Sequence, residues 1–258
     1  MRIEKAYKEI FIFVAGTTPQ IITETICALS QKTIPIYPDE IFIITTLTGK
    51  RFIEKQLLDS GILSEMMLEL GLPQIPITEG SFVVPKDANN FEIDDIRSEE
   101  ENELMGNLIT SLVRDKSNDP SSRLHCSIAG GRKTMSFYLG AALQLFGRPQ
   151  DKLYHVLVTP EFELNPSVFY KPKKNRIIQG RGIDGKPKQL NTKNANIELA
   201  ELPFIRLSGK ISFQGKDFRE LVLEGQRTID LAMVQPELVV NLLERYIRIG
   251  DTIIEMLP

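Results

Sequence analysis

The feature that most constrains this chain is the stretch of residues 127–136, in which two glycines separate an apolar run from a helical pattern. Residues 124–129 predict a buried strand, Gly130 and Gly131 permit a tight turn, and residues 133–146 predict a helix. The first N–H groups of such a helix have no partner inside it, and they carry partial positive charge. The stretch therefore predicts an α/β protein with an anion site above the turn.

Two basic residues of this turn, Arg132 and Lys133, favour phosphate as the anion. An ordinary glycine turn with two solvated bases fits the stretch equally well. The turn is not a P-loop, because the four residues that a P-loop has between its glycines are missing. It also lacks the GxGxxG fingerprint of dinucleotide-binding proteins.

Composition limits what the ligand and the setting can be. The 258 residues are 42% hydrophobic and 25% charged, which suits one good core and a small second domain. A formal charge of −3 favours a small anion in a local pocket, and we expect no binding of duplex DNA. Cys27 and Cys126 form no metal-binding or disulfide pattern, so we expect no metal, no cofactor and a reducing cytoplasm. No signal peptide or 18-residue apolar run predicts a membrane location.

A second turn follows the first strand, which we expect at residues 9–15. This turn carries Gly16, Thr17, Thr18 and Gln20 before a helix over residues 19–29, which either threonine can cap. For a single threonine, a plain helix cap is the usual explanation. Two adjacent hydroxyls and a glutamine on one loop favour ligand contact.

A third turn, with Gly49 and Lys50, follows a strand expected at residues 40–46 and leads into a helix over residues 50–70, interrupted at 60–61. Further strands are expected at 74–78 and 152–158. Acidic residues within 94–103 begin a helix that ends at about residue 114, and we interpret this acidic cluster as a solvated face. This alternation predicts a Rossmann-like open, mostly parallel sheet with helices on both faces. The turns at Gly16, Gly49 and Gly130 then share its carboxyl edge, where such sheets bind ligands.

The two histidines, His125 and His155, lie inside apolar strands, and we interpret both as core residues rather than general bases. We expect a first domain over residues 1–208, which includes edge strands within 160–208. Its basic segment 171–194 fits a mobile flap over the ligand and an exposed hairpin equally well. A C-terminal extension, residues 209–258, should contain a helix over 217–234 and a hairpin over 239–257 around Gly250-Asp251.

Residues 13–25 and 129–136, taken together and in this order, resemble the CRISPR-associated Rossmann-fold (CARF) family, closest to its ring-nuclease-like branch. The likeness covers roughly residues 8–207, and segments 160–170 and 199–207 contribute to it. The resemblance implies a homodimer that binds cyclic oligoadenylate across its two-fold axis, as cyclic tetra- or hexa-adenylate. Cyclic oligoadenylates are second messengers of type III CRISPR systems, and several family members cleave the ring.

The resemblance also implies site residues. It assigns to two ligand loops the residues Gly16, Thr17, Thr18, Gln20, Gly130, Gly131, Arg132, Lys133, Thr134, Met135 and Ser136. Lys133 matches the family lysine that supports binding and cleavage. Thr17 or Thr18 stands where the first loop often carries a serine, and we name both with Lys133 as catalytic candidates.

With no metal cluster and no exposed histidine expected, cleavage would depend on in-line attack by the ring's own 2′-hydroxyl, leaving a 2′,3′-cyclic phosphate. A positioned lysine and backbone N–H groups would stabilise the developing charge. Two alternatives remain open. One is a non-cleaving sensor that signals to a partner protein. The other is a transcription regulator, because the terminal helix and hairpin resemble the start of a winged helix, although residues up to 258 contain no recognition helix.

Overall fold

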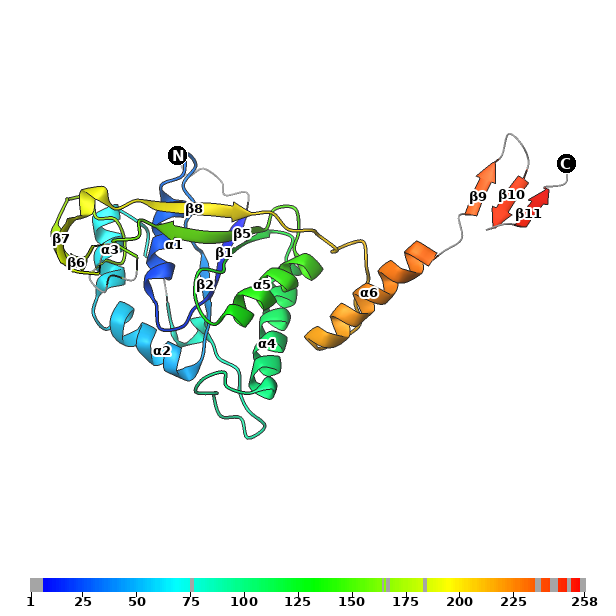
Figure 1. The fold of residues 1–258 in the computed structure, drawn as a ribbon, viewed down its shortest axis with the longest axis horizontal. Helices are drawn as coiled ribbons and strands as arrows, with labels where there is room; N and C mark the ends of the chain where they lie inside the picture. Colours follow the sequence, from blue (N-terminus) through cyan, green and yellow to red (C-terminus); the bar gives the residue numbers. More distant parts are fainter. Residues whose placement is uncertain are drawn as a thin grey trace. The chain divides into compact units, whose positions relative to one another are not determined.

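The computed structural model of the protein describes residues 7–74, 77–163, 165, 168–182 and 185–234, together with three short strands farther along the chain. Two compact units make up the chain, Met1–Ser208 and Gly209–Pro258. In the first unit, helices cover both faces of a twisted sheet (Figure 1). Among the described residues, no helix has the length and apolar character that crossing a membrane requires.

The central sheet has six strands in the order β3-β2-β1-β4-β5-β8, which are Phe82–Val83, Glu40–Ile44, Lys8–Val14, Ser122–Ser127, Lys152–Val158 and Ile197–Leu202. The first five strands are parallel, and β8 is antiparallel to β5. In the register of β1, Phe13 lies opposite Ile43 of β2 and Ser127 of β4. The predicted Rossmann-like, mostly parallel sheet is confirmed, with β1 near its centre.

The helices divide between the two faces of the sheet. They are α1 (Gln20–Ser30), α2 (Leu47–Ile53), the π-helix η1 (Glu54–Leu58), α3 (Ile62–Leu70), α4 (Glu99–Ser117) and α5 (Lys133–Phe146). Successive residues of a strand point to opposite faces. Phe11 and Phe13 of β1 therefore pack with α1, η1 and α3, whereas Ile10 and Ile12 pack with α4 and α5.

One strand prediction is wrong. Residues 74, 77 and 78 are not in a strand, and residues 75 and 76 of the expected strand lie outside the described residues. The place beside β2 is taken instead by β3, where Phe82 pairs with Ile43. A proline in a five-residue segment removes one donor of the ladder, which disfavours a strand there. β3 begins directly after η2, a 3-10 turn at Glu79–Ser81.

The basic segment 171–194 is a hairpin. Its strands β6 (Ile177–Arg181) and β7 (Pro187–Asn191) pair antiparallel, and a short 3-10 turn, η3 (Thr192–Asn194), leads to β8. Glu69 of α3 fastens the segment that enters the hairpin. Its carboxylate accepts hydrogen bonds from the Tyr170 hydroxyl at 2.8 Å, the Lys173 N–H at 2.7 Å and Arg176 at 2.9 Å.

The second unit contains one helix, α6 (Phe218–Val234), among its described residues, followed by the three-stranded antiparallel sheet β11-β10-β9. These strands are Leu238–Asn241, Tyr246–Ile249 and Thr252–Glu255 in chain order. The predicted helix and the antiparallel pairing of the last two strands are confirmed. Gly250 and Asp251, where we expected the turn, lie outside the described residues.

Candidate functional site

The glycine turns after β1 and β4 are in direct contact. A Cβ atom built on Gly16 would lie 3.4 Å from the Cα of Gly131, and one built on Gly130 would lie 2.9 Å from the carbonyl oxygen of Val14. Gly131 has a φ of 73°, a backbone conformation that favours glycine. Because β1 and β4 are neighbours at the point where the strand order reverses, both turns lie at the place where open α/β sheets bind ligands.

The helix that follows each turn begins at this edge. α5 starts at Lys133, and α1 starts at Gln20 with Pro19 as its N-cap. No side chain caps α1, so the expected cap by Thr17 or Thr18 is wrong. Thr17 is exposed and Thr18 is partly exposed. The third N–H group of each helix donates to the carbonyl oxygen of the N-cap residue, Ile22 to Pro19 at 3.1 Å and Met135 to Arg132 at 2.9 Å. The first two N–H groups of each helix are therefore the ones available to an anion.

Two residues of the second loop hold the turn in shape. Met135 is buried, and its sulfur accepts the Arg132 N–H at 3.3 Å. Ser136 donates its hydroxyl proton to the carbonyl oxygen of Ile128 at 3.0 Å. Lys133 and Thr134, the two residues directly before Met135, are exposed. The structure therefore leaves Lys133 and Thr134 accessible at the start of α5, with Met135 and Ser136 beneath them.

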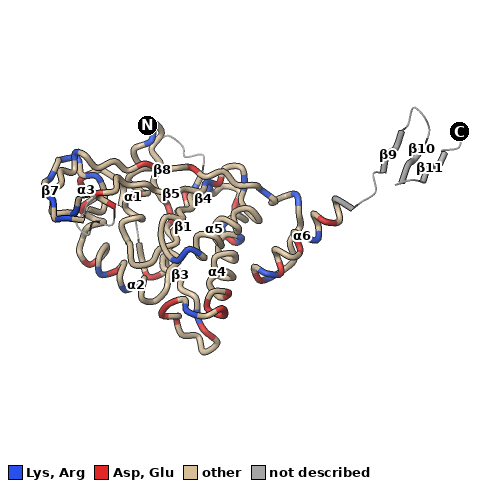
Figure 2. Tube along the Cα trace, viewed as in Figure 1, with Lys and Arg blue, Asp and Glu red and all other residues tan. Residues whose placement is uncertain are grey.

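Arg132 is an ion-pair partner of Asp95, which lies in the segment that precedes α4. The two side chains form a bidentate pair with nitrogen–oxygen distances of 2.6 and 3.1 Å. The hydrogen bond from Arg132 is the main reason why the pKa of Asp95 falls to about 2. Acidic residues gather around this segment and the start of α4 (Figure 2). Lys133 forms no ion pair with any described residue, so it offers the less compensated charge.

The third turn supports the first one. A Cβ atom on Gly49 would lie 3.3 Å from the carbonyl oxygen of Gly16. The N–H groups of Leu47 and Thr48, at the start of α2, already donate to backbone carbonyls of residues 93 and 94 at 2.9 and 3.2 Å. Lys50 is buried and pairs with Glu79 and Glu92. The predicted ligand residues Gly49 and Lys50 thus lie close to the other turns, with their polar groups already engaged.

A cavity of about 160 Å³ opens beside the first two turns. It is lined by Thr18, Gln20, Ile21, Glu24, Ala129, Gly130, Gly131, His155, Val156, Val158 and Glu163. These residues come from the turn after β1, α1, the turn after β4, β5 and the segment that follows β5. The structure therefore brings four predicted site residues, Thr18, Gln20, Gly130 and Gly131, to one cavity.

Two buried polar side chains on α1 line this cavity. Gln20 is 6% exposed, and its side-chain oxygen has no hydrogen-bond partner among the described residues. Glu24 is 4% exposed. Its burial, together with the nearby carboxylate of Glu163, raises its pKa to about 7. A strongly perturbed carboxyl group in a cavity is typical of a functional site.

Sequence reasoning missed Glu24, Glu163 and His155. His125 is buried as predicted, and its ring contacts Glu9 at 2.7 Å. His155, in contrast, is only partly buried and lines the cavity, so its interpretation as a core residue is wrong. The pairing of β5 with β4 explains the difference, because it ends at Tyr154 and leaves His155 paired with Ala200 of β8 alone. A signal for Glu24 was present, because residues four apart on a helix share a face and Gln20 was already a candidate.

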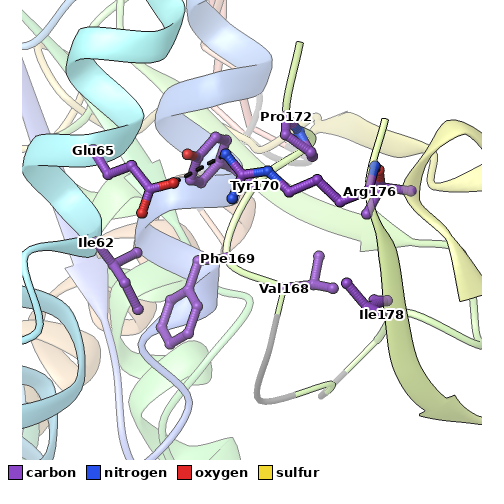
Figure 3. Close-up of a pocket in the computed structure, with 9 residues that line it drawn as sticks. Ile62, Glu65, Val168, Phe169, Tyr170, Pro172, Arg176 and Ile178 are labelled. Atoms are coloured by element: carbon purple, nitrogen blue, oxygen red, sulfur yellow. Dashed lines mark hydrogen bonds and ion pairs between the residues drawn. The ribbon is translucent and has the colours of Figure 1, made fainter. Parts of the chain in front are cut away.

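A second, smaller cavity of about 100 Å³ lies between α3 and the hairpin. Arg176 reaches from the hairpin to Glu65 of α3 at 3.0 Å, above Phe169 (Figure 3). The carbonyl oxygen of Phe169 accepts the hydroxyl proton of Thr23 at 2.5 Å. Since Thr23 lies on α1 between Gln20 and Glu24, the base of the hairpin is connected to the helix that lines the first cavity.

The fold and this site define a Rossmann-like α/β protein with a polar cavity between two glycine turns, at the point where the strand order reverses. The family model of CRISPR-associated protein NE0113 (Cas_NE0113) matches residues 18–230. The chain belongs to this family of CRISPR-associated proteins. Comparison with curated protein sequences gives no match. The matched residues include the second glycine turn and all the cavity-lining residues.

Proposed function

We propose that this protein binds a cyclic oligoadenylate second messenger of type III CRISPR immunity, as CARF proteins do, and cleaves the ring. The observation that carries the proposal is the meeting of two glycine turns and two helix starts beside a polar cavity. Membership of a CRISPR-associated family supports it. The resemblance of both loops to the CARF ring-nuclease branch supports the choice of ligand.

The phosphates of the ring would lie at the starts of α1 and α5. Backbone N–H groups and the helix dipole favour an anion there, and Lys133 adds one accessible full charge. Thr17 and Thr18 supply hydroxyl groups on the opposite turn. Since Arg132 is paired with Asp95, we expect it to contribute less than Lys133 unless the ligand displaces that carboxylate.

Cleavage would proceed by in-line attack of a ribose 2′-oxygen on the adjacent phosphorus. The bond from phosphorus to the 5′-oxygen breaks, that oxygen takes up a proton, and the 2′-hydroxyl loses one. The product is a linear chain with a 2′,3′-cyclic phosphate and a 5′-hydroxyl. Lys133 and the N–H groups would stabilise the charge on phosphorus, and a preorganised donor of this kind is typically worth ~10²–10³ in rate.

We also propose that the working unit is a homodimer with one shared site. A ring with an even number of identical units has its own two-fold axis, so an isologous interface can present the same turn to opposite phosphates. The stoichiometry should then be one ring per two chains. A monomer in sedimentation with and without ligand, or one ring per chain in calorimetry, would contradict the shared site.

Incubation with labelled cyclic tetra- and hexa-adenylate, followed by chromatography, tests binding and cleavage together. We expect one ring size to be converted to a product with 2′,3′-cyclic phosphate ends, in the presence of EDTA as well as without it. A product with 5′-phosphate ends would refute the 2′-hydroxyl mechanism. The Lys133→Ala variant serves as the matched control, because it should lose conversion while keeping its fold.

A second candidate function is a sensor that binds the ring intact and signals to a partner. The second unit favours it, because α6 exposes Val222, Leu223, Ile229 and Leu231, which suits contact with another protein. Tight binding without any product in the same chromatography would select the sensor. A shift assay with DNA tests the remaining alternative, a transcription regulator.

A further inference from the structure

We propose that the cavity beside the turns accepts a nucleobase that carries an amino group, and that Gln20 and Glu24 select that base. The inference rests on the proposed function and assigns the parts of the ligand. Phosphates would lie at the helix starts, and a base would enter the cavity. Gln20 and Glu24 would thus be the specificity-determining residues of the site.

Gln20 provides the first reason. Its side-chain oxygen is a buried acceptor without a partner among the described residues, although its residue is only 6% exposed. Buried polar atoms in folded proteins are nearly always hydrogen-bonded, so an unpartnered one next to a cavity indicates a missing donor. An amide side chain can pair with adenine through two hydrogen bonds, accepting from the amino group and donating to a ring nitrogen.

The charge of the cavity provides the second reason. Glu24 and Glu163 both line it, and their mutual repulsion is one of the causes that raise the pKa of Glu24 to about 7. A phosphate would add a third negative group to this repulsion. A base with N–H donors meets no such penalty. Near neutral pH the Glu24 carboxyl is present in both forms, so it can accept from an amino group or donate to a ring nitrogen.

Size gives the third reason. The cavity measures about 160 Å³, which is below the range of ~300–1,000 Å³ that is usual for sites of drug-sized ligands. That is room for one ring system and not for a cyclic oligonucleotide. Ile21, Val156 and Val158 supply apolar walls, which suit the faces of a base.

Calorimetry with two rings of equal size tests the inference on the full chain. One ring carries adenine, and the other carries hypoxanthine, in which a carbonyl oxygen replaces the amino group. Wild-type protein should bind the hypoxanthine ring at least tenfold more weakly, because a carbonyl oxygen then takes the place of the amino group that would donate to the buried Gln20 oxygen. Equal affinity for the two rings would overturn the inference while leaving ring binding, and so the proposed function, intact.

Variants assign the selectivity to its residues. Gln20→Leu, with similar volume and no amide, should bring the two affinities within about threefold of each other. Gln144→Leu, an exposed position on α5, should keep the wild-type ratio. A Gln20→Leu variant that keeps the ratio would also overturn the inference. The wild-type comparison of the two rings needs no variant, so a Gln20→Leu protein that fails to fold leaves the test in force.

Failure of the proposed function is recognised separately. If wild-type protein binds neither ring, the cyclic ligand is wrong, and adenosine and inosine monophosphates replace the rings in the same calorimeter. A preference for the adenosine nucleotide that Gln20→Leu abolishes would support the base pocket without the ring. Binding of neither nucleotide, or of both equally, would overturn it.

Discussion

Replacing Glu24 by glutamine should stabilise the ligand-free protein above pH 7. Burial and, second, the Glu163 carboxylate raise the pKa of Glu24 from its ordinary 4.5 to about 7. A carboxyl whose pKa is higher in the folded chain holds its proton more tightly when folded. The stability that this proton contributes is therefore fully present below pH 4.5 and is lost as the pH rises through 7.

The size of the effect follows from the difference between the two pKa values. Each pKa unit corresponds to ~1.36 kcal/mol, so the rise from 4.5 to about 7 gives about 3 kcal/mol. The residue is 4% exposed, which leaves little screening by solvent. Glutamine keeps the shape of the side chain and cannot ionise. Glu24→Gln should accordingly match wild type near pH 4.5 and exceed it by about 3 kcal/mol at pH 8.

Urea unfolding at pH 5 and pH 8 measures the difference, and Glu69→Gln is the control of opposite sign. Burial opposes ionisation of Glu69, but hydrogen bonds from Tyr170 and two backbone N–H groups, with the charge of Arg176, lower its pKa overall. Glu69→Gln should therefore lose stability at pH 8. A Glu24→Gln protein that is no more stable than wild type at pH 8 would refute the reasoning.

Three further predictions concern the loops and the hairpin. Lys133→Ala should weaken ring binding about tenfold or more in calorimetry, because a charged hydrogen bond contributes ~1.5–3 kcal/mol. The control Lys193→Ala, at an exposed position, should bind like wild type. A Lys133→Ala protein with wild-type affinity would show that Lys133 is not part of the site. Gly131→Ala should lower the free energy of unfolding by ~1–2 kcal/mol, because φ is 73° and the new Cβ would lie 2.9 Å from the sulfur of Met135; urea unfolding with an unchanged midpoint would contradict this. Tyr170→Phe removes the hydrogen bond to the Glu69 carboxylate of α3, so it should lower the free energy of unfolding by about 1 kcal/mol and speed proteolysis in the hairpin. An unchanged cleavage rate would argue that other contacts hold the hairpin.

The strands of the sheet could be predicted where they are continuous apolar runs. β1 is buried along nearly its whole length, and five of its seven residues are apolar. β4 contains only two apolar residues, Leu124 and Cys126, so the glycine turn that follows it was the stronger signal. β3 could not be predicted, because a strand of two residues is fixed by its pairing with Ile43 and Ile44 and not by its own pattern. The interruption expected at residues 60–61 was visible as Ser60-Gly61, and Gly61 has a φ of 75°.

Only the features of the site that depend on the backbone could be predicted from the sequence. Consecutive parallel strands bring their turns to one edge, so the meeting of Gly16 with Gly130 and Gly131 follows from the alternation of elements. Ion pairs do not follow from it. Asp95 lies 37 positions before Arg132, and Glu79 lies 29 positions after Lys50. The sequence near Arg132 and Lys50 therefore gives no signal that these side chains form ion pairs.

The acids around the turns divide the site into two electrostatic parts. Asp95 compensates Arg132 and leaves Lys133 with the helix starts as the region that favours an anion. On the other side of the glycine turns, the carboxyl groups of Glu24 and Glu163 make the cavity unfavourable for an anion. A ligand that satisfies both parts must carry phosphate next to a group rich in N–H donors, which is the chemistry of an amino-bearing nucleotide. Burying the ionised Glu24 carboxylate costs the folded protein about 3 kcal/mol at pH 8. That is a large share of the ~5–15 kcal/mol that stabilises a typical domain, so the presence of Glu24 is more readily explained by a ligand than by the fold.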